Sequence, residues 1–229
     1  MMSILDQTNS SDRKVVFADK MNWLQDNLQE MGSLVEEAIG RCIEALKRQD
    51  MDLARAVIEG DDRIDDLERT IEEKCLELIA TQQPMAKDLR RVATLFKMIN
   101  DLERMADYAT SIAKITLRIA DQPLIKPLVD IPRMAVLSQK MVKQSLDAYV
   151  REDVELAVAV GNDDDEVDKL FGQIFRELLT IMMENPRTIT QATHLLFVGR
   201  WLERISDHAT NIAEEVIFLS TGEKKKLND

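Results

Sequence analysis

Apolar residues recur at spacings of three and four along most of the chain, which is the period of an α-helix with one buried face. In the first half this spacing predicts a helix over residues 17–46 and a second that begins near residue 50 or 52 and ends at Gln83-Pro84. A third is predicted from after Pro84 toward Ile119. An acidic side chain at Asp50 or Asp52 can cap the second helix, and Pro84 separates the second from the third. The first half therefore reads as three long amphipathic helices.

The segment 121–132 is the strongest break in the pattern, because it contains three prolines. Beyond it the same order returns, with helices predicted over residues 134–149, 153–184 and 188–219. Asn185-Pro186 stands where the first half has Gln83-Pro84. The boundary between two similar units is placed in this proline-containing segment.

Residue identities show that the second unit repeats the first. Leu102-Glu103-Arg104 recurs as Leu202-Glu203-Arg204, and Ala109-Thr110 recurs as Ala209-Thr210. Shared periodicity alone would not reproduce such runs, so an internal duplication is the economical explanation. Three amphipathic helices bury their apolar faces against one another. The predicted fold is therefore all-α, with two tandem antiparallel three-helix bundles related by a pseudo-two-fold axis. Its parts are a disordered tail over 1–13, bundles over 14–122 and 126–220, and a polar tail over 221–229.

Composition narrows the classes of function. The formal net charge of −12 would repel the phosphate backbone of a nucleic acid, so we expect no nucleic-acid partner. The first residues lack the apolar core of a signal peptide, and no uncharged run reaches the roughly 20 residues of a membrane span, so a cytoplasmic location is the default. Cys42 and Cys75 fit helical patterns without zinc or redox spacing and are expected to be buried thiols.

Acidic residues four positions apart are the candidate chemistry of this chain. On a helix this spacing puts both carboxylates on one face, about 5–6 Å apart, where two like charges repel. Each half has two such pairs at matched positions, and four pairs at duplicated positions indicate a shared role. The pairs are Asp61 with Asp65, Glu103 with Asp107, Asp164 with Asp168, and Glu203 with Asp207.

If the second and third helices of a half are neighbours, one pair on each would bring four carboxylates together. Oxygen-only clusters suit hard or borderline cations such as magnesium, manganese or iron, with zinc less favoured. The alternative is a metal-free scaffold, because acidic pairs are common on solvated helix faces and Arg104 and Arg204 could neutralise them locally. His208 is not expected to be a ligand, because its counterpart in the first half is Tyr108.

No catalytic constellation is apparent in the sequence. The seven glycines are scattered and form no phosphate-binding loop, and no Ser/His/Asp or Cys/His set could act as nucleophile and base. A carboxylate-bridged di-metal oxidase is the enzymatic alternative. Such bundles use Glu-x-x-His pairs, and neither His194 nor His208 lies three residues after a Glu. The chain is therefore expected not to be an enzyme.

The duplicated segments resemble the signature of the PhoU family. The resemblance lies in Ile99-Asn100-Asp101-Leu102-Glu103-Arg104-Met105-Ala106-Asp107 and in Trp201-Leu202-Glu203-Arg204-Ile205-Ser206-Asp207-His208-Ala209-Thr210-Asn211-Ile212-Ala213-Glu214, and it extends over about residues 17–219.

The resemblance implies more than the residues alone predict. It implies a cytoplasmic negative regulator of the phosphate-starvation response that links the ATPase subunit of a high-affinity phosphate transporter to a sensor histidine kinase. It also implies a homodimer that meets the membrane only through these partners. Metal binding through the paired acidic motifs is implied too, with iron, manganese, magnesium or zinc as the candidate ions.

Overall fold

The computed structural model describes the backbone of residues 4–227 and the side chains of residues 15–227. This part of the chain is helical and contains no strand, as the sequence predicted. No helix within it is long and apolar enough to cross a bilayer. The elements are α1 (Ile4–Arg48), α2 (Met51–Gln82), α3 (Lys87–Ile119), α4 (Asp130–Arg151), α5 (Val154–Glu184), the 3₁₀ turn η1 (Pro186–Thr188) and α6 (Ile189–Thr221).

The second helix of each half begins with the same aspartate cap. The Asp50 carboxylate accepts hydrogen bonds from the backbone N–H groups of Asp52 and Leu53, at 3.0 and 2.9 Å. Asp153 accepts one from Leu156 at 3.0 Å. These bonds satisfy N–H groups that have no partner within the helix. The repeated cap fixes where α2 and α5 start, and hence the register of the acidic residues along them.

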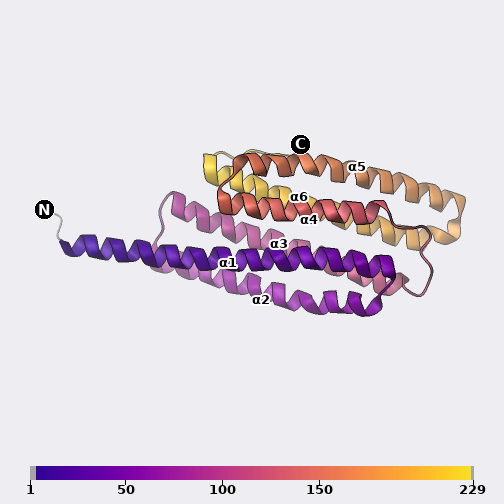
Figure 1. Ribbon diagram of the computed structural model, residues 1–229, viewed down its shortest axis with the longest axis horizontal. Helices are drawn as coiled ribbons and strands as arrows, with labels where there is room; N and C mark the ends of the chain where they lie inside the picture. The colour runs from indigo at the N-terminus through magenta and orange to yellow at the C-terminus, as the bar shows by residue number, and fades with distance from the viewer. Residues whose placement is uncertain (1–3, 228–229) are drawn as a thin grey trace.

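Each half is a bundle of three long helices, α1–α3 and α4–α6, and the two bundles lie side by side along the long axis (Figure 1). The halves are joined because α3 packs against α6 and α1 packs against α4. One continuous set of buried apolar side chains runs through both halves, including the equivalent residues Leu102 and Leu202. The fold class predicted from the sequence is confirmed, and the two bundles share one core.

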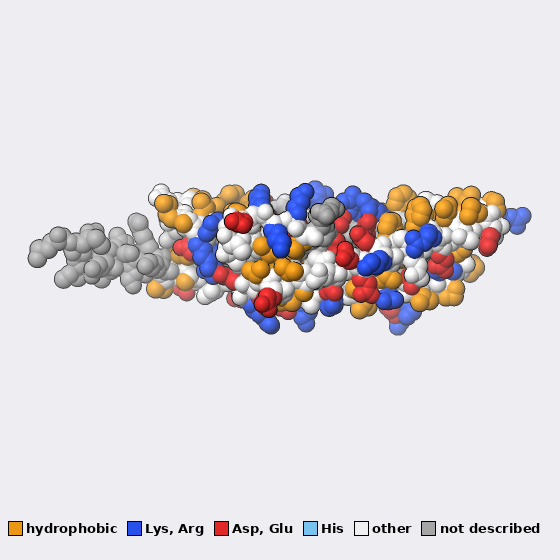
Figure 2. Space-filling model, turned by 90° about the horizontal axis from the view of Figure 1, so that it is seen from above, with side chains coloured by type: hydrophobic (Ala, Val, Ile, Leu, Met, Phe, Trp, Pro, Cys, Tyr) orange, Lys and Arg blue, Asp and Glu red, His pale blue; other side chains and the backbone are white. Residues whose placement is uncertain are grey.

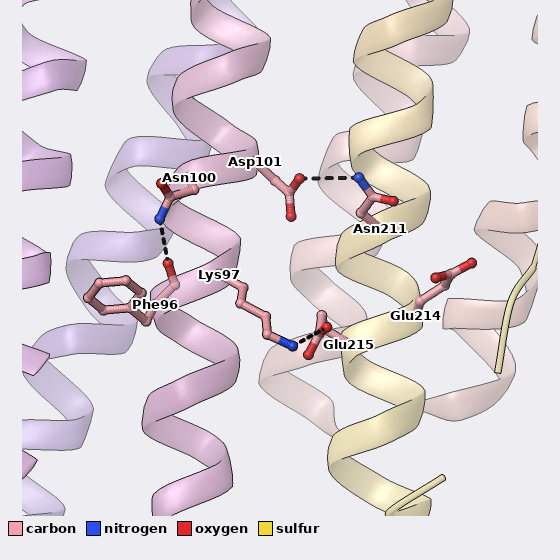
Figure 3. A pocket seen from close by; sticks show the side chains of 7 residues that line it. All are labelled: Phe96, Lys97, Asn100, Asp101, Asn211, Glu214 and Glu215. Atoms are coloured by element: carbon pink, nitrogen blue, oxygen red, sulfur yellow. Dashed lines mark hydrogen bonds and ion pairs between the residues drawn. The ribbon is translucent and has the colours of Figure 1, made fainter. Parts of the chain in front are cut away.

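Polar contacts add to the apolar packing between the halves. Across the α3–α6 interface, Asp101 accepts a hydrogen bond from Asn211 at 3.3 Å, and the Lys97 ammonium lies 2.6 Å from Glu215 (Figure 3). Lys97 also lies over the Phe218 ring, 5.9 Å from its centroid. The groove between the two helices here has a volume of about 440 Å³. These contacts bind the two repeats to each other over their polar margin as well as through their core.

The chain ends differ from the predicted tails. Helix α1 begins at Ile4 although residues 1–13 were predicted to be disordered, and residues 1–3 lie outside the described part. No proline or glycine occurs before Gly32, so nothing in the sequence stops the helix from extending toward the N-terminus. As a result, α1 projects past the end of its own bundle (Figure 1).

The predicted polar tail over 221–229 folds back onto the second bundle. Helix α6 ends at Thr221, and Gly222 adopts a positive φ of 78° that turns the chain. The backbone N–H of Leu227 then donates to the Glu214 carboxylate at 2.8 Å. A Cβ at Gly161 would lie 3.0 Å from the Leu227 Cβ, so the glycine makes room for this contact. Residues 228–229 lie outside the described part.

The break between the halves is a loop that follows Ile119 and ends where α4 begins at Asp130. Pro132 therefore lies in the first turn of α4, where a missing N–H costs no helical hydrogen bond.

Cys42 and Cys75 are buried free thiols, as predicted, and burial raises the pKa of Cys75 to about 12. Both thiols therefore behave as core side chains.

Charged and hydrophobic side chains are not evenly distributed over the surface of the molecule. Seen from above, charged side chains of both signs lie along its middle, and hydrophobic side chains gather most densely over the end where α5 and α6 join (Figure 2).

Candidate functional site

The acidic pairs of the first half face one another across α2 and α3. Asp61 and Asp65 lie one turn apart on α2, and Glu103 and Asp107 lie one turn apart on α3. The carboxylate of Asp61 is close enough to that of Asp107 for their charges to repel, and the same holds for Glu103 and Asp65. We call these four side chains the first cluster. Their meeting follows from the antiparallel packing of α2 and α3 and from the matched spacing on both helices.

Burial and mutual repulsion perturb the first cluster. Burial, then the neighbouring Asp107 charge, raises the pKa of Glu103 to about 7. Burial and the Asp65 charge also raise the pKa of Asp61, and a hydrogen bond from Thr110 opposes this shift. Both shifts mean that negative charge is costly here because the carboxylates are partly removed from water and lie close together. A cation would relieve that cost.

The second half repeats the arrangement on α5 and α6. Asp164 and Asp168 lie one turn apart on α5, and Asp164 is only 2% exposed. Burial raises the pKa of both Glu203 and Asp207 on α6, and the Asp168 charge raises each of them further. We call these four side chains the second cluster. The structure thus places matching carboxylates along the α2–α3 contact and along the α5–α6 contact, which we call the two outer seams.

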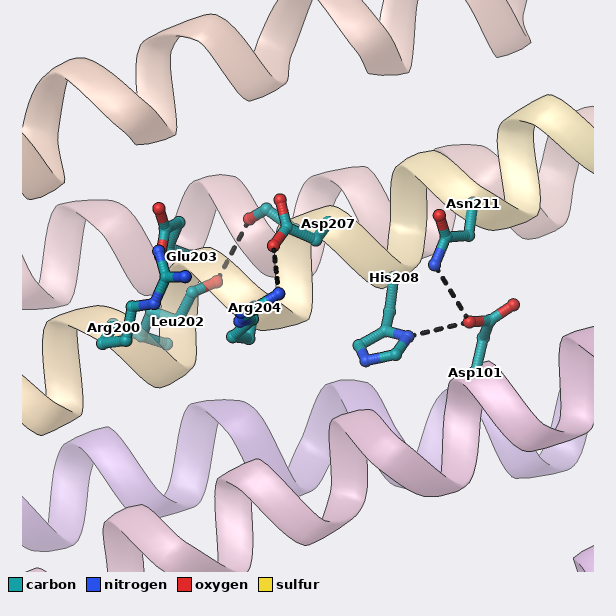
Figure 4. A network of polar contacts seen from close by, with 9 residues as sticks. Asp101, Arg200, Leu202, Glu203, Arg204, Asp207, His208 and Asn211 are labelled. Carbon is teal, nitrogen blue, oxygen red and sulfur yellow. Dashed lines mark hydrogen bonds and ion pairs between the residues drawn. The ribbon is translucent and has the colours of Figure 1, made fainter. Parts of the chain in front are cut away.

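Arginines neutralise the two clusters unequally. In the first, the Arg104 guanidinium lies 3.6 Å from Glu103 and from Asp107. In the second, Arg204 lies 3.5 Å from Asp207, and Arg200 forms a further ion pair with Glu203 (Figure 4). The expected local neutralisation by arginine is therefore present in both halves. The first half has Asn100 at the position that corresponds to Arg200, so its cluster has one cation fewer.

The donor set fits a hard cation in its chemistry, since every available ligand atom is a carboxylate oxygen. Among the side chains at residues 15–227, however, no three or more Asp, Glu, His or Cys lie close enough together to hold a metal ion. The carboxylates on α3 and α6 form ion pairs with arginines. Metal binding would therefore require Glu103, Asp107, Glu203 and Asp207 to turn away from these arginines toward the facing helix.

Sequence reasoning missed two contributors to these seams. Glu68 extends the first cluster, and burial together with the Glu72 and Asp65 charges raises the pKa of its carboxyl. Arg200 partners Glu203, and its position three residues before that glutamate is the usual spacing of a helical ion pair. The three-residue spacing from Arg200 to Glu203 and from Asp65 to Glu68 is the sequence feature that could have identified both residues.

His208 has a structural contact with the other half of the molecule. Its Nδ1 lies 2.8 Å from the Asp101 carboxylate, which Asn211 also contacts (Figure 4). Its ring lies 5.9 Å from that of Tyr108, its own counterpart in the repeat. The side chain therefore joins α6 to α3. His194, the other histidine, is half-buried in the same helix.

The duplicated arrangement is also found in known proteins. The family model for the PhoU domain matches the chain twice, over residues 28–116 and 131–216. The chain belongs to the PhoU family. Both matches include the acidic pairs of their half, so the duplication read from the sequence is also a duplication of this domain.

Relatives of similar length support the assignment to the PhoU family. A phosphate-specific transport system accessory protein PhoU homolog from Clostridium acetobutylicum is 42% identical over 215 residues, covering 93% of this chain and 98% of that protein. A homolog of the same name from Caulobacter vibrioides is 44% identical over 209 residues, covering 91% of each.

Solved structures agree with the sequence comparisons. The crystal structure of PhoU from Pseudomonas aeruginosa superposes with a TM-score of 0.87 at 38% identity, covering 90% of this chain and 100% of that one. The phosphate transport system regulatory protein PhoU from Streptococcus pneumoniae superposes with a TM-score of 0.85 at 28% identity, covering 92% and 99%. This PhoU-family chain is thus matched over nearly its whole length.

The perturbed Glu103 predicts a pH-dependent stability in metal-free protein. Its folded pKa of about 7 lies above the ordinary 4.5, so the folded state binds the proton more tightly and loses stability as pH rises between these values. Glu103→Gln is therefore expected to raise the thermal midpoint at pH 8 by more than at pH 5, measured in chelator. Glu59→Gln, at an exposed position on α2, is the control and should change neither midpoint. An equal effect of Glu103→Gln at both pH values would contradict the assigned electrostatics.

Proposed function

We propose that this protein is a cytoplasmic negative regulator of the phosphate-starvation response. In this proposal it couples the ATPase subunit of a high-affinity phosphate transporter to a sensor histidine kinase and restrains phosphate uptake when phosphate is plentiful. The observation that carries the proposal is the near-full-length match to PhoU proteins that are named for the phosphate transport system. The role is non-catalytic and depends on contact with partners, which also bring it to the membrane.

The proposal includes divalent or transition metal binding at the two carboxylate clusters. The support is electrostatic: the clusters combine partial burial with facing negative charges, and the pKa of Asp61, Glu103, Glu203 and Asp207 is raised. A bound cation would offset this repulsion and tie α2 to α3 and α5 to α6. Metal occupancy would then stiffen the α2–α3 and α5–α6 contacts.

A metal-free scaffold is the second candidate, and one observation favours it. The arginine contacts of Glu203 and Asp207 already satisfy part of the second cluster without an ion. In that case the acidic pairs would serve only the surface charge and the partner contacts. The metal content of the purified protein separates the two candidates.

Deleting the coding sequence tests the regulatory role. In phosphate-rich medium the deletion is expected to raise transcription of phosphate-uptake genes several-fold, because the kinase loses its restraint. Supplying the intact chain in trans should restore repression. Unchanged transcription in the deletion strain would rule out negative regulation.

A further inference from the structure

The segment that follows α6 forms a strap across the α5–α6 seam. We call residues 222–227 the strap. It leaves α6 through Gly222, whose positive φ of 78° turns the chain back. At its far end the backbone N–H of Leu227 donates to the Glu214 carboxylate at 2.8 Å, and the Leu227 side chain packs against the core. The end of the chain therefore lies beside α5 (Figure 1).

A glycine on α5 makes room for Leu227. A Cβ at Gly161 would lie 3.0 Å from the Cβ of Leu227 and 3.4 Å from its Cδ1, so a side chain larger than that of Ala would displace the leucine. The corresponding residue of the first half is Ile58, which packs against the core with its own side chain. The second half lacks an apolar side chain at this point of its seam, and Leu227 of the strap supplies one.

Few contacts hold the strap in place. Among the described residues, the bond from Leu227 to Glu214 is the one hydrogen bond that the strap makes beyond the last turn of α6. The side chains at positions 223–226 are exposed. One hydrogen bond and one partly buried leucine oppose the conformational entropy lost in ordering the whole segment. We therefore expect the strap to open readily.

The surface under Leu227 has a defined chemistry. We call Gly161, Glu214 and the apolar surface that Leu227 covers the strap site. Glu214 accepts a backbone N–H, which any peptide segment can offer, and Gly161 leaves space for one apolar side chain. Residues 163–166 of α5 are four consecutive acidic side chains, and residues 224–226 of the strap are three lysines. Charge complementarity therefore favours a basic segment that carries a leucine-sized side chain.

We propose that the strap site is a docking site for a basic, leucine-containing segment of a partner protein, and that the strap is an internal competitor for that segment. The partner segment binds when the strap opens, with its leucine against Gly161 and a backbone N–H on Glu214. Because the closed strap lowers the fraction of binding-competent protein, it lowers the apparent affinity for the partner. The site lies one turn of α5 before Asp164, so it borders the second cluster but shares no residue with it.

Fluorescence anisotropy with a labelled peptide of the strap sequence, Gly-Glu-Lys-Lys-Lys-Leu, tests the site on the full-length chain in chelator. The variant Leu227→Ser loosens the strap and leaves the rest of the protein intact. It is expected to bind the peptide at least ~10-fold more tightly than the wild type, because the strap no longer competes. A peptide with serine in place of its leucine should not bind.

A second substitution on α5 locates the bound peptide. Gly161→Ile installs the side chain that the first half carries at this position, and it should abolish peptide binding when it is added to Leu227→Ser. The matched control adds Gly60→Ile instead. A Cβ at this α2 glycine would have no neighbour within 4 Å, so the control should bind the peptide as tightly as Leu227→Ser alone. Circular dichroism checks that each variant is folded.

Several results would overturn the proposal. Failure of the peptide to bind Leu227→Ser would remove the docking site, and equal binding by the wild type would show that the strap does not compete. Equal binding of the serine peptide would reduce the contact to charge attraction alone. Binding retained in folded protein that carries Gly161→Ile would place the peptide elsewhere. None of these readouts depends on transcription or on metal, so the proposed function is tested separately.

Discussion

Leu102→Ala is expected to lower the free energy of unfolding by about 2–5 kcal/mol, because a buried leucine loses its transfer energy and leaves a cavity. Leu102 is fully buried on α3, which packs against α1, α2 and α6 at once. The surrounding helices cannot all close in to fill the space. For a chain of 229 residues the thermal midpoint should fall by on the order of 10 °C. Calorimetry or denaturant unfolding measures the loss.

Leu89→Ala is the control for that core substitution. Leu89 lies on the same helix but is 41% exposed, so its replacement should cost less than about 1 kcal/mol. A comparable loss for the two variants would mean that α3 is not the central helix of a core shared by both halves. The equivalent substitution Leu202→Ala should behave like Leu102→Ala, because the repeat places it in the same environment on α6.

The second large effect concerns metal. Purified wild type dialysed against a divalent transition metal is expected to retain it by elemental analysis. A metal held by the folded state at a free concentration of 100 times its Kd stabilises that state by about 2.7 kcal/mol. Replacing the four α3 and α6 carboxylates with Ala should abolish both the retained metal and the stabilisation. These residues are Glu103, Asp107, Glu203 and Asp207.

A second quadruple variant controls for the change of charge. It replaces four exposed acidic residues outside the clusters with Ala, namely Asp26, Glu59, Glu73 and Glu155. This variant should bind metal like the wild type. Metal retained by the cluster variant would make the site assignment wrong. A wild type that holds no metal would favour the metal-free scaffold.

The fold could be predicted from the sequence because the hydrophobic periodicity, the helix caps at the aspartates before α2 and α5, and the positions of the prolines all indicate the same six helices. The duplication then identified which helices are equivalent. The chain ends were harder to predict. The polar residues before Phe17 carry no apolar period, and the return of Leu227 onto Gly161 depends on a tertiary contact that no local pattern encodes.

The candidate site could be predicted in position but not in detail. Spacing placed Glu103 and Asp107 on one face, and antiparallel packing brought them opposite Asp61 and Asp65. Which way each carboxylate turns depends on competition between arginines and the facing acids. Arg200 forms an ion pair with Glu203, whereas its repeat counterpart Asn100 carries no charge and cannot form one with Glu103. The two clusters therefore differ in their arginine partners although their acidic residues match.

The exposed apolar side chains of α5 were also missed at the level of sequence, for a related reason. Apolar residues at four-residue spacing on α5 predict burial, and the helical period cannot distinguish a core stripe from an exposed one. The structure separates the two, since Ile174 and Leu178 are buried and Phe175 and Leu179 are exposed.

The most direct test of the account measures transcription of phosphate-uptake genes in a deletion strain that expresses the cluster variant. The variant replaces Glu103, Asp107, Glu203 and Asp207 with Ala, and its abundance is matched to that of the wild-type chain by immunoblotting. If the carboxylate clusters serve regulation, transcription stays high in phosphate-rich medium, while the wild type and the control quadruple variant repress it. Full repression by the cluster variant would contradict the claim that these seams are the functional site.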